Sequence, residues 1–187
     1  MSIFVFLSHP QPSSEAQLRF IDELSAYLEA RSFVPRTLGI TDYDINAPLT
    51  AVRRLLLECN GVVTVALRRM LVDHGRVLRR VAAREDGVVS VTGSWLTSPW
   101  AHIEPAMAYQ LGLPIIHIRE KDVLPDGILE RGVLGLCGPE FDLDAHAPAE
   151  YLRSPEWVAV SGQWEGYVRS VFDRKGRPPV LYGAPAY

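Results

Sequence analysis

Along the first third of the chain, continuous apolar runs alternate with segments in which apolar residues recur at helical spacing. Residues 3–7 form a continuous apolar run, which is typical of a central strand of a parallel sheet because both faces of such a strand are covered. Residues 33–38 are a weaker strand in which a proline indicates an edge or a strand start. Residues 62–67 are a third apolar run. Between these runs, apolar residues recur at helical spacing.

Two helices are expected between the three runs. Ser13 or Ser14 can cap the first, and Pro48 opens the second. Their predicted buried faces are Leu18, Ile21, Leu24 and Leu28 in the first, and Leu49, Val52, Leu55, Leu56 and Cys59 in the second. The order strand, helix, strand, helix, strand predicts an α/β fold with a parallel sheet.

The second half of the chain continues this order. Residues 115–118 predict a fourth strand and residues 132–136 a fifth, followed by an irregular connection over 138–160. Ser161 can cap a last helix, whose apolar face is Trp164, Tyr167, Val168, Val171 and Phe172. We expect a single domain over residues 1–176, with an insertion at about 68–94 and a Pro- and Gly-rich tail over 177–187.

The insertion holds six arginines, with Met70, Val77, Leu78 and Val81 at helical spacing. A solvated helical face is the simpler interpretation. The alternative is a phosphate-binding face, because guanidinium groups suit phosphate oxygens. Residues 88–92 suggest a short extra strand.

Composition narrows the classes of function. The 187 residues include 48% hydrophobic and 22% charged residues, which is ordinary for a soluble domain. The net charge of -3 gives no general attraction to nucleic acid or to an anionic membrane, and no run approaches the ~18 apolar residues of a membrane span. No signal peptide is recognisable, and two cysteines make neither a disulfide framework nor a metal site. We expect a cytoplasmic protein without a bound metal or cofactor.

One carboxylate stands out. Glu104 is the only acid between Asp86 and Glu120, and it lies among apolar residues in a stretch with two tryptophans, residues 95–105. A buried acid is costly unless it has a partner or a ligand, so this stretch is a candidate site.

Two segments of the chain resemble Toll/interleukin-1 receptor (TIR) domains. Residues 4–9, Phe-Val-Phe-Leu-Ser-His, resemble the first-strand box of that family, and residues 98–104, Ser-Pro-Trp-Ala-His-Ile-Glu, resemble its Ser-x-Trp-Cys-x-x-Glu motif with alanine in place of cysteine. The loop at 39–47 stands in the place of the family's BB loop. The resemblance covers roughly residues 1–137 and implies a flavodoxin-like, three-layer fold with a central parallel sheet of about five strands.

In catalytic TIR domains the glutamate of this motif is essential for cleaving NAD⁺. The resemblance therefore implies that Glu104 is the catalytic residue of an NAD⁺ hydrolase or ADP-ribosyl cyclase, with NAD⁺ or a related nucleotide as substrate. It also implies self-association and, by a looser likeness to standalone bacterial TIR proteins, a role in anti-phage immunity. Pro105 departs from the pattern, because a proline there either starts the helix at Glu104 or kinks it.

Ligands of parallel α/β sheets collect beyond the carboxyl ends of the strands. The expected substrate-binding residues are therefore Ser8, His9, Asp42, Tyr43, Ser98 and Trp100. Each has a structural interpretation as well: Ser98 can cap a helix, Trp100 can belong to the core, and Asp42 can form a turn. Glu104 itself can be a paired acid, for example with an arginine of the insertion.

Two other classes of function stay open. Residues 104–114, with Glu104, Ala108, Gly112 and Pro114 at matching spacing, also resemble nucleoside 2-deoxyribosyltransferases, which use a glutamate nucleophile. Their first strand usually runs into a Gly-Pro loop, whereas this chain has Ser8-His9-Pro10. The third possibility is a non-catalytic TIR adaptor or nucleotide-binding module.

Overall fold

A five-stranded parallel sheet forms the centre of the computed structural model, which describes residues 2–45, 47–78 and 88–174. The strand order is β2-β1-β3-β8-β9, and each neighbouring pair is parallel. The strands are β1 (Ile3–Ser8), β2 (Phe33–Arg36), β3 (Val62–Ala66), β8 (Ile115–Arg119) and β9 (Leu136–Cys137). This confirms the predicted three-layer α/β fold, with β2 as the expected edge strand.

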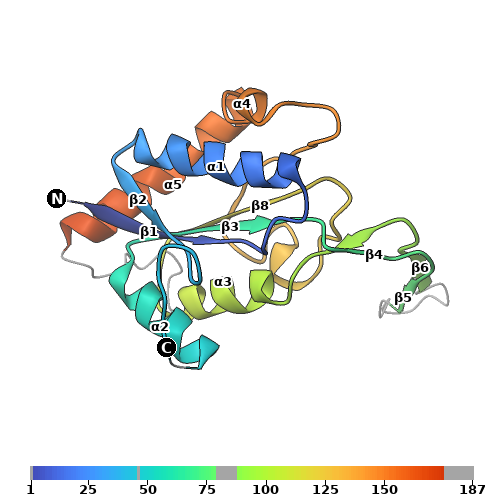
Figure 1. Ribbon diagram of the computed structural model, residues 1–187, viewed down its shortest axis with the longest axis horizontal. Helices are drawn as coiled ribbons and strands as arrows, with labels where there is room; N and C mark the ends of the chain where they lie inside the picture. The colour runs from blue at the N-terminus through green and yellow to red at the C-terminus, as the bar shows by residue number, and fades with distance from the viewer. Residues whose placement is uncertain (1, 46, 79–87, 175–187) are drawn as a thin grey trace, which may run out of the picture.

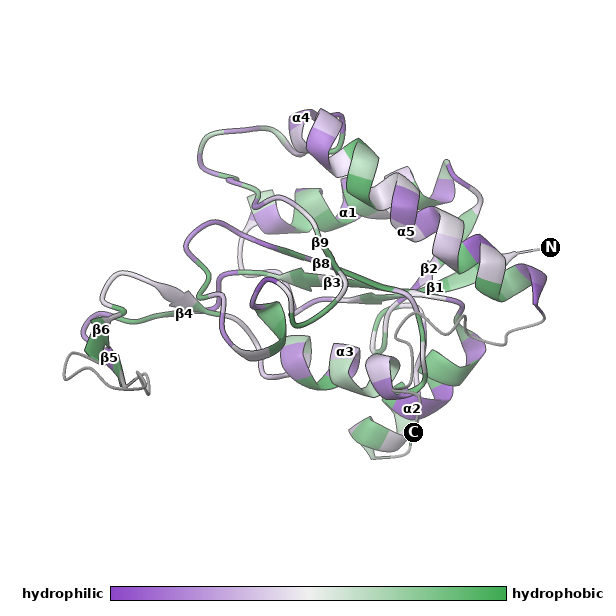
Figure 2. Ribbon diagram, turned by 180° about the vertical axis from the view of Figure 1, so that it is seen from behind, coloured by the Kyte–Doolittle hydropathy of each residue, from purple (hydrophilic) through white to green (hydrophobic). Residues whose placement is uncertain are grey.

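Helices cover both faces of the sheet (Figure 1). On one face lie α1 (Glu15–Glu29), α4 (Pro148–Tyr151) and α5 (Pro155–Asp173), and on the other α2 (Pro48–Glu58) and α3 (Trp100–Gln110). The alternate residues of each strand enter two separate cores. Val5 and Leu7 pack toward α1 and α5, whereas Phe6 packs toward α2 and α3. Figure 2 shows the central strands as mostly apolar and the helices as two-sided.

Local signals account for the start of α1. Ser14 is its N-cap and accepts a hydrogen bond from the Gln17 backbone N–H at 3.2 Å. The predicted buried face needs one correction, because Leu18 is exposed and Gln17 is buried in its place. The Gln17 amide is satisfied by the Arg68 carbonyl and the Glu120 carboxylate, two partners that are remote in sequence. In α2, Leu49 is likewise exposed, and Ala51 is buried.

The expected helix in the insertion is wrong. Residues 70–78 and 88–96 form an arm of two short antiparallel strand pairs, in which β4 (Met70–Leu71) pairs with β7 (Trp95–Leu96) and β5 (Arg76–Leu78) with β6 (Val88–Ser90). The arm projects from the sheet beyond the end of β3 (Figure 1), and β6 confirms the short extra strand. The described apolar residues whose spacing suggested a helix lie instead in short strands, and each of these strands pairs with a strand further along the chain. Val81 and the arginines at 79, 80 and 84 lie outside the described residues.

Two boundaries after α3 also differ from expectation. The fifth strand lies at Leu136–Cys137, because Gly132 adopts a φ of 89° in a turn that Arg131 and Leu134 bridge. The last helix begins at Pro155 rather than after Ser161. Ser154 caps it, accepting from the Trp157 N–H at 3.3 Å, and a proline follows at the first helical position.

The expected irregular connection therefore holds for residues 138–147 only, because residues 148–151 belong to α4 and residues 155–160 to α5. Ser161 lies buried within α5, where its hydroxyl contacts Tyr27 Oη at 2.9 Å. The tail over 177–187 lies outside the described residues. In the part of the chain that is described, no helix is both long and apolar enough to cross a membrane.

Candidate active site

The strand order places a topological switch point between β1 and β3. The chain leaves β1 toward β2 on one side, whereas β3 and β8 follow on the other, so the connections diverge at the carboxyl ends of β1 and β3. In open α/β sheets, ligands bind at this switch point. Because α3 leads into β8, its first turns lie at this same edge of the sheet.

Glu104 meets Ser8 at this point. Ser8 is the last residue of β1 and is buried, and its hydroxyl donates a short hydrogen bond to the Glu104 carboxylate. Glu104 lies in the second turn of α3, on the face that also buries Ala101 and Ala108, and only 9% of its surface is exposed. The two segments that carry the TIR resemblance are therefore in direct contact.

Burial controls the charge of Glu104. Loss of solvent raises the pKa of this carboxyl to about 7, and the Ser8 hydrogen bond opposes that shift. In the described part of the chain Glu104 makes no ion pair, so pairing with a described arginine of the insertion does not explain it. Arg68 instead contacts the carboxylates of Asp122 and Asp144. A carboxyl that titrates near neutral pH at a ligand-binding edge is a candidate catalytic group.

Pro105 does not begin the helix. α3 starts at Trp100 and continues through Pro105 to Gln110. Pro105 leaves the Ala101 carbonyl without its helical N–H donor, yet the helix stays in register. The helix that carries Glu104 is therefore held by packing against the sheet rather than by its own hydrogen bonds alone.

Three more of the expected residues lie near this edge. His9 follows β1, where burial lowers the pKa of its imidazole while the Pro10 carbonyl, 2.8 Å from Nδ1, opposes that shift. Ser98 is buried and accepts from the Trp100 backbone N–H at 3.3 Å, so it supports the start of α3. Trp100 is 37% exposed and lies at the helix start rather than in the core. A pocket of about 380 Å³ lies beside this turn, between residues 96–103 and 124–126.

The other two expected residues lie in the loop after β2. The Asp42 carboxylate is held by the Arg36 guanidinium and by the Thr41 hydroxyl at 2.9 Å, and these bonds keep the pKa of Asp42 below its usual range. Tyr43 is 79% exposed and extends into solvent. This loop begins beside β1, since the Thr37 hydroxyl donates to the Leu7 carbonyl at 2.9 Å. The structure does not bring Asp42 or Tyr43 into hydrogen-bonding contact with Glu104.

Two polar residues that the sequence interpretation missed lie on the same face of the sheet. Ser8 pairs in register with Thr64 of β3, and Thr64 pairs with His117 of β8. Thr64 and His117 are both 0% exposed. Each interrupts an otherwise apolar strand, and that single polar position was the available signal.

The described residues contain no group of three or more His, Cys, Asp or Glu that could hold a metal ion. The second acid near this edge, Glu120, has its carboxylate occupied. Glu120 Oε2 accepts from Gln17 Nε2 and from the Arg68 backbone N–H, both at 2.8 Å. Glu104, by contrast, has one hydroxyl partner, which leaves lone pairs available to a ligand.

Comparison with known proteins adds little to this geometry. No family model matches the chain, and no curated protein matches it significantly. Among solved structures, the chain is similar to a CMP N-glycosidase of Clostridium botulinum, with 17% identity over 80% of this chain and 94% of that chain and a TM-score of 0.47. At this identity and TM-score the similarity carries no argument about activity, and the TIR resemblance stays a prediction.

Proposed function

We propose that the chain is an enzyme that cleaves the N-glycosidic bond of a nucleotide, with Glu104 as the catalytic residue. The observation that carries the proposal is the hydrogen bond between Ser8 and Glu104 at the carboxyl edge of β1. It joins a buried, weakly partnered carboxyl to the place where α/β sheets bind ligands.

The chemistry suits one carboxylate. Breaking the bond between C1′ and the base nitrogen leaves positive charge on the ribose, as in glycoside hydrolysis. An ionised Glu104 in a site with little water stabilises that charge electrostatically. Ser8 donates to the carboxylate and so favours its ionised form. Water then adds to C1′ and releases one proton.

NAD⁺ is the substrate that we propose within this class. Its nicotinamide departs as a neutral base with the bonding electrons, so the leaving group needs no proton from the enzyme. This matches a site in which Glu104 is the titratable group and Ser8 its partner. The motif that contains Ser98, Trp100 and Glu104 supports the same substrate through its resemblance to catalytic TIR domains. The proposed contacts of His9, Asp42 and Tyr43 with substrate, and roles in self-association and anti-phage defence, remain part of this proposal.

Glu104→Gln tests the proposal. Purified protein is incubated with NAD⁺, alone and with a crowding agent, and nicotinamide release is followed by chromatography. We expect the variant to lose at least about 100-fold in rate, because the electrostatic stabilisation of a charged transition state is usually a large term. Glu58→Gln is the matched control, since Glu58 is an exposed acid on α2 that pairs with Arg36 and Arg54.

Parallel incubations with CMP and with a deoxynucleoside plus a free base distinguish the alternatives. Base release from CMP with none from NAD⁺ would keep the N-glycosidase class and replace the substrate. Base exchange on deoxynucleosides would instead support the transferase alternative. Equal rates for wild type and Glu104→Gln would contradict the role of Glu104.

A further inference from the structure

A row of polar side chains crosses the sheet under α3. Ser8, Thr64 and His117 are register partners on β1, β3 and β8, so their side chains point to the same face. That face also receives Glu104, through Ser8. The neighbouring positions Val62 and Ile115 of this face are apolar, and two arginines, Arg36 of β2 and Arg119 of β8, lie on the same face by register.

The inner members of the row are poorly satisfied by the protein. Among the described residues Thr64 Oγ1 is buried without a hydrogen-bond partner, and the buried His117 ring makes no hydrogen bond of good geometry, although the Leu129 carbonyl lies close enough to act on its pKa. Burial lowers the pKa of His117 to about 4, with the charge of Arg119 acting in the same direction and the Leu129 carbonyl opposing it. The ring is therefore neutral near pH 7 and offers one donor and one acceptor. Buried polar atoms without partners are rare in folded proteins and usually bind ordered water.

The spacing of the strands suits water. Neighbouring strands lie about 4.8 Å apart, which is too far for a direct bond between short side chains in register. One water molecule between two such groups, with bonds of about 2.8 Å to each, spans that distance. The Ser8 hydroxyl, which donates to Glu104, still has lone pairs for a further donor.

We propose that Thr64 and His117 bind buried water that joins Ser8, so that Ser8, Thr64 and His117 form one hydrogen-bonded chain ending at Glu104. Thr64 and His117 are then positioning residues, which stabilise the ionised form of Glu104 from beneath α3. The proposal deepens the proposed function, since it concerns the same carboxyl. Its tests use protein without substrate, so they stand whether or not NAD⁺ is cleaved.

Among the described residues, no charged group contributes to the pKa shift of Glu104. Burial and the Ser8 bond are the causes of its pKa shift. Arg119 is ion-paired with Glu140. The elements packed against α3 carry other titratable groups, none of which is a cause of the Glu104 shift. They are His9 after β1, His117 and Arg119 on β8, Arg53, Arg54, Glu58 and Cys59 on or after α2, and Asp126 and Glu130 beside the turn at Gly127–Leu129, with His102 and Tyr109 on α3 itself.

Thr64→Val gives the first test, because a hydrated and a dry Thr64 hydroxyl predict opposite changes in the midpoint of chemical unfolding. If Thr64 Oγ1 binds water, its loss leaves that water with fewer partners, and the midpoint of chemical unfolding falls. If the site is dry, valine removes an unsatisfied polar atom, and the midpoint stays or rises. We expect a fall, with Thr64→Ser closer to wild type. Thr37→Val calibrates the assay, because the Thr37 hydroxyl has a known protein acceptor at 2.9 Å.

The second test follows the titration of Glu104 by NMR of a ¹³C-labelled side chain. We expect Thr64→Val and His117→Phe to raise its midpoint by about half a unit, which is a roughly threefold lower ratio of ionised to protonated form. Thr64→Ser should keep the wild-type midpoint. A loss of packing alone would not move the midpoint in this pattern. Unchanged midpoints in both variants, or a high-resolution crystal structure without density between Thr64 and His117, would overturn the proposal.

Discussion

At the scale of single residues, the raised pKa of Glu104 has a cost to folding that depends on pH. An acid whose pKa is higher in the folded state than in the unfolded chain binds more protons when folded. The contribution of Glu104 to the free energy of unfolding is therefore greatest below pH 4.5, its pKa in the unfolded chain. It falls as the pH rises from 4.5 to about 7 and is constant above that value. The shift corresponds to roughly 3 kcal/mol at most.

Glu104→Gln removes this penalty, and glutamine can still accept the Ser8 hydrogen bond. We expect the free energy of unfolding of the variant, relative to wild type, to increase from pH 4.5 to pH 7, by up to roughly 3 kcal/mol. Urea unfolding at a series of pH values measures the difference. A difference that is flat across this window would show that the Glu104 carboxyl is not desolvated.

Glu58→Gln is a control of opposite sign. Hydrogen bonds from Arg36 and Arg54 hold the pKa of Glu58 below its usual range, so wild type gains stability from this acid as the pH rises. The Glu58→Gln variant should therefore lose stability relative to wild type as the pH rises toward 4.5, and show no further trend between pH 4.5 and 7. A trend above pH 4.5 in Glu104→Gln that Glu58→Gln lacks excludes a general effect of removing one negative charge.

At the scale of elements, the sequence predicts those features of helices and strands that are determined by residues close together in the chain. The cap of α1 at Ser14 and the apolar run of β3 follow from local signals, and both are confirmed. The candidate site is partly predictable for the same reason, because Glu104 and Ser8 belong to recognisable local motifs.

Features that depend on remote partners were not predictable in the same way. Gln17 is buried because Glu120, over a hundred residues away, accepts its amide. The row of Thr64 and His117 exists only once β1, β3 and β8 are placed side by side. The strand pairing within the arm could not be predicted either, because strands of two or three residues are too short to show an alternating apolar pattern.

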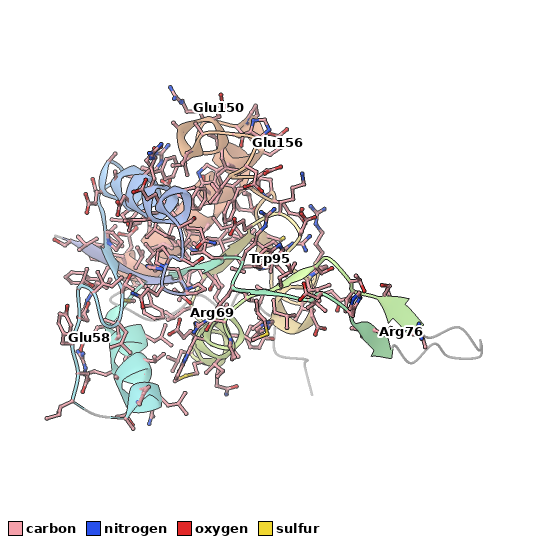
Figure 3. The ribbon with its side chains drawn as sticks, turned by 45° about the vertical axis from the view of Figure 1, so that its right-hand side comes forward. Glu58, Arg69, Arg76, Trp95, Glu150 and Glu156 are labelled. Carbon is pink, nitrogen blue, oxygen red and sulfur yellow. The ribbon has the colours of Figure 1, made fainter. Side chains whose placement is uncertain are left out.

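The arm is expected to be dispensable for folding. Its outer part exposes Val77, Val88 and Val89, and Figures 2 and 3 show it projecting away from the sheet, with Arg76 far from the helical layers. The Gly93 N–H donates to the Val72 carbonyl at 2.9 Å, so an Asn-Gly dipeptide in place of residues 73–92 would close a two-residue hairpin. We expect the thermal midpoint to change by only a few degrees.

Trp95→Ala is the matched control at the base of the arm. The Trp95 ring packs against the core cluster of Ala66, Val123 and Leu129, so its removal should cost about 3 kcal/mol. Light scattering of the shortened protein also tests whether the apolar arm contributes to the expected self-association. Loss of cooperative unfolding in the shortened protein would show that the arm belongs to the folding unit.

At the scale of the whole molecule, two places compete for a nucleotide. One is the β1–β3 switch point with Glu104. The other is a pocket of about 470 Å³ between the loops after β8 and β9 and the helices α4 and α5. Its lining includes the acids Glu140, Asp142, Glu150 and Glu156, and Figure 3 shows Glu150 and Glu156 together at that end of the molecule. Carboxylates at this density repel the phosphates of a dinucleotide.

We therefore expect NAD⁺ to bind at the β1–β3 switch point rather than in the acidic pocket, even though that pocket has a volume of about 470 Å³. Hydrogen exchange of Glu104→Gln with and without NAD⁺ measures the location, because the variant binds substrate with little turnover. Peptides containing residues 8–10, 67–69 and 98–104 should be protected, and those covering 139–156 should not. Protection confined to 139–156 would move the nucleotide to the opposite helical layer. Glu104 would then be a structural acid, whose only role is its contact with Ser8 beneath α3.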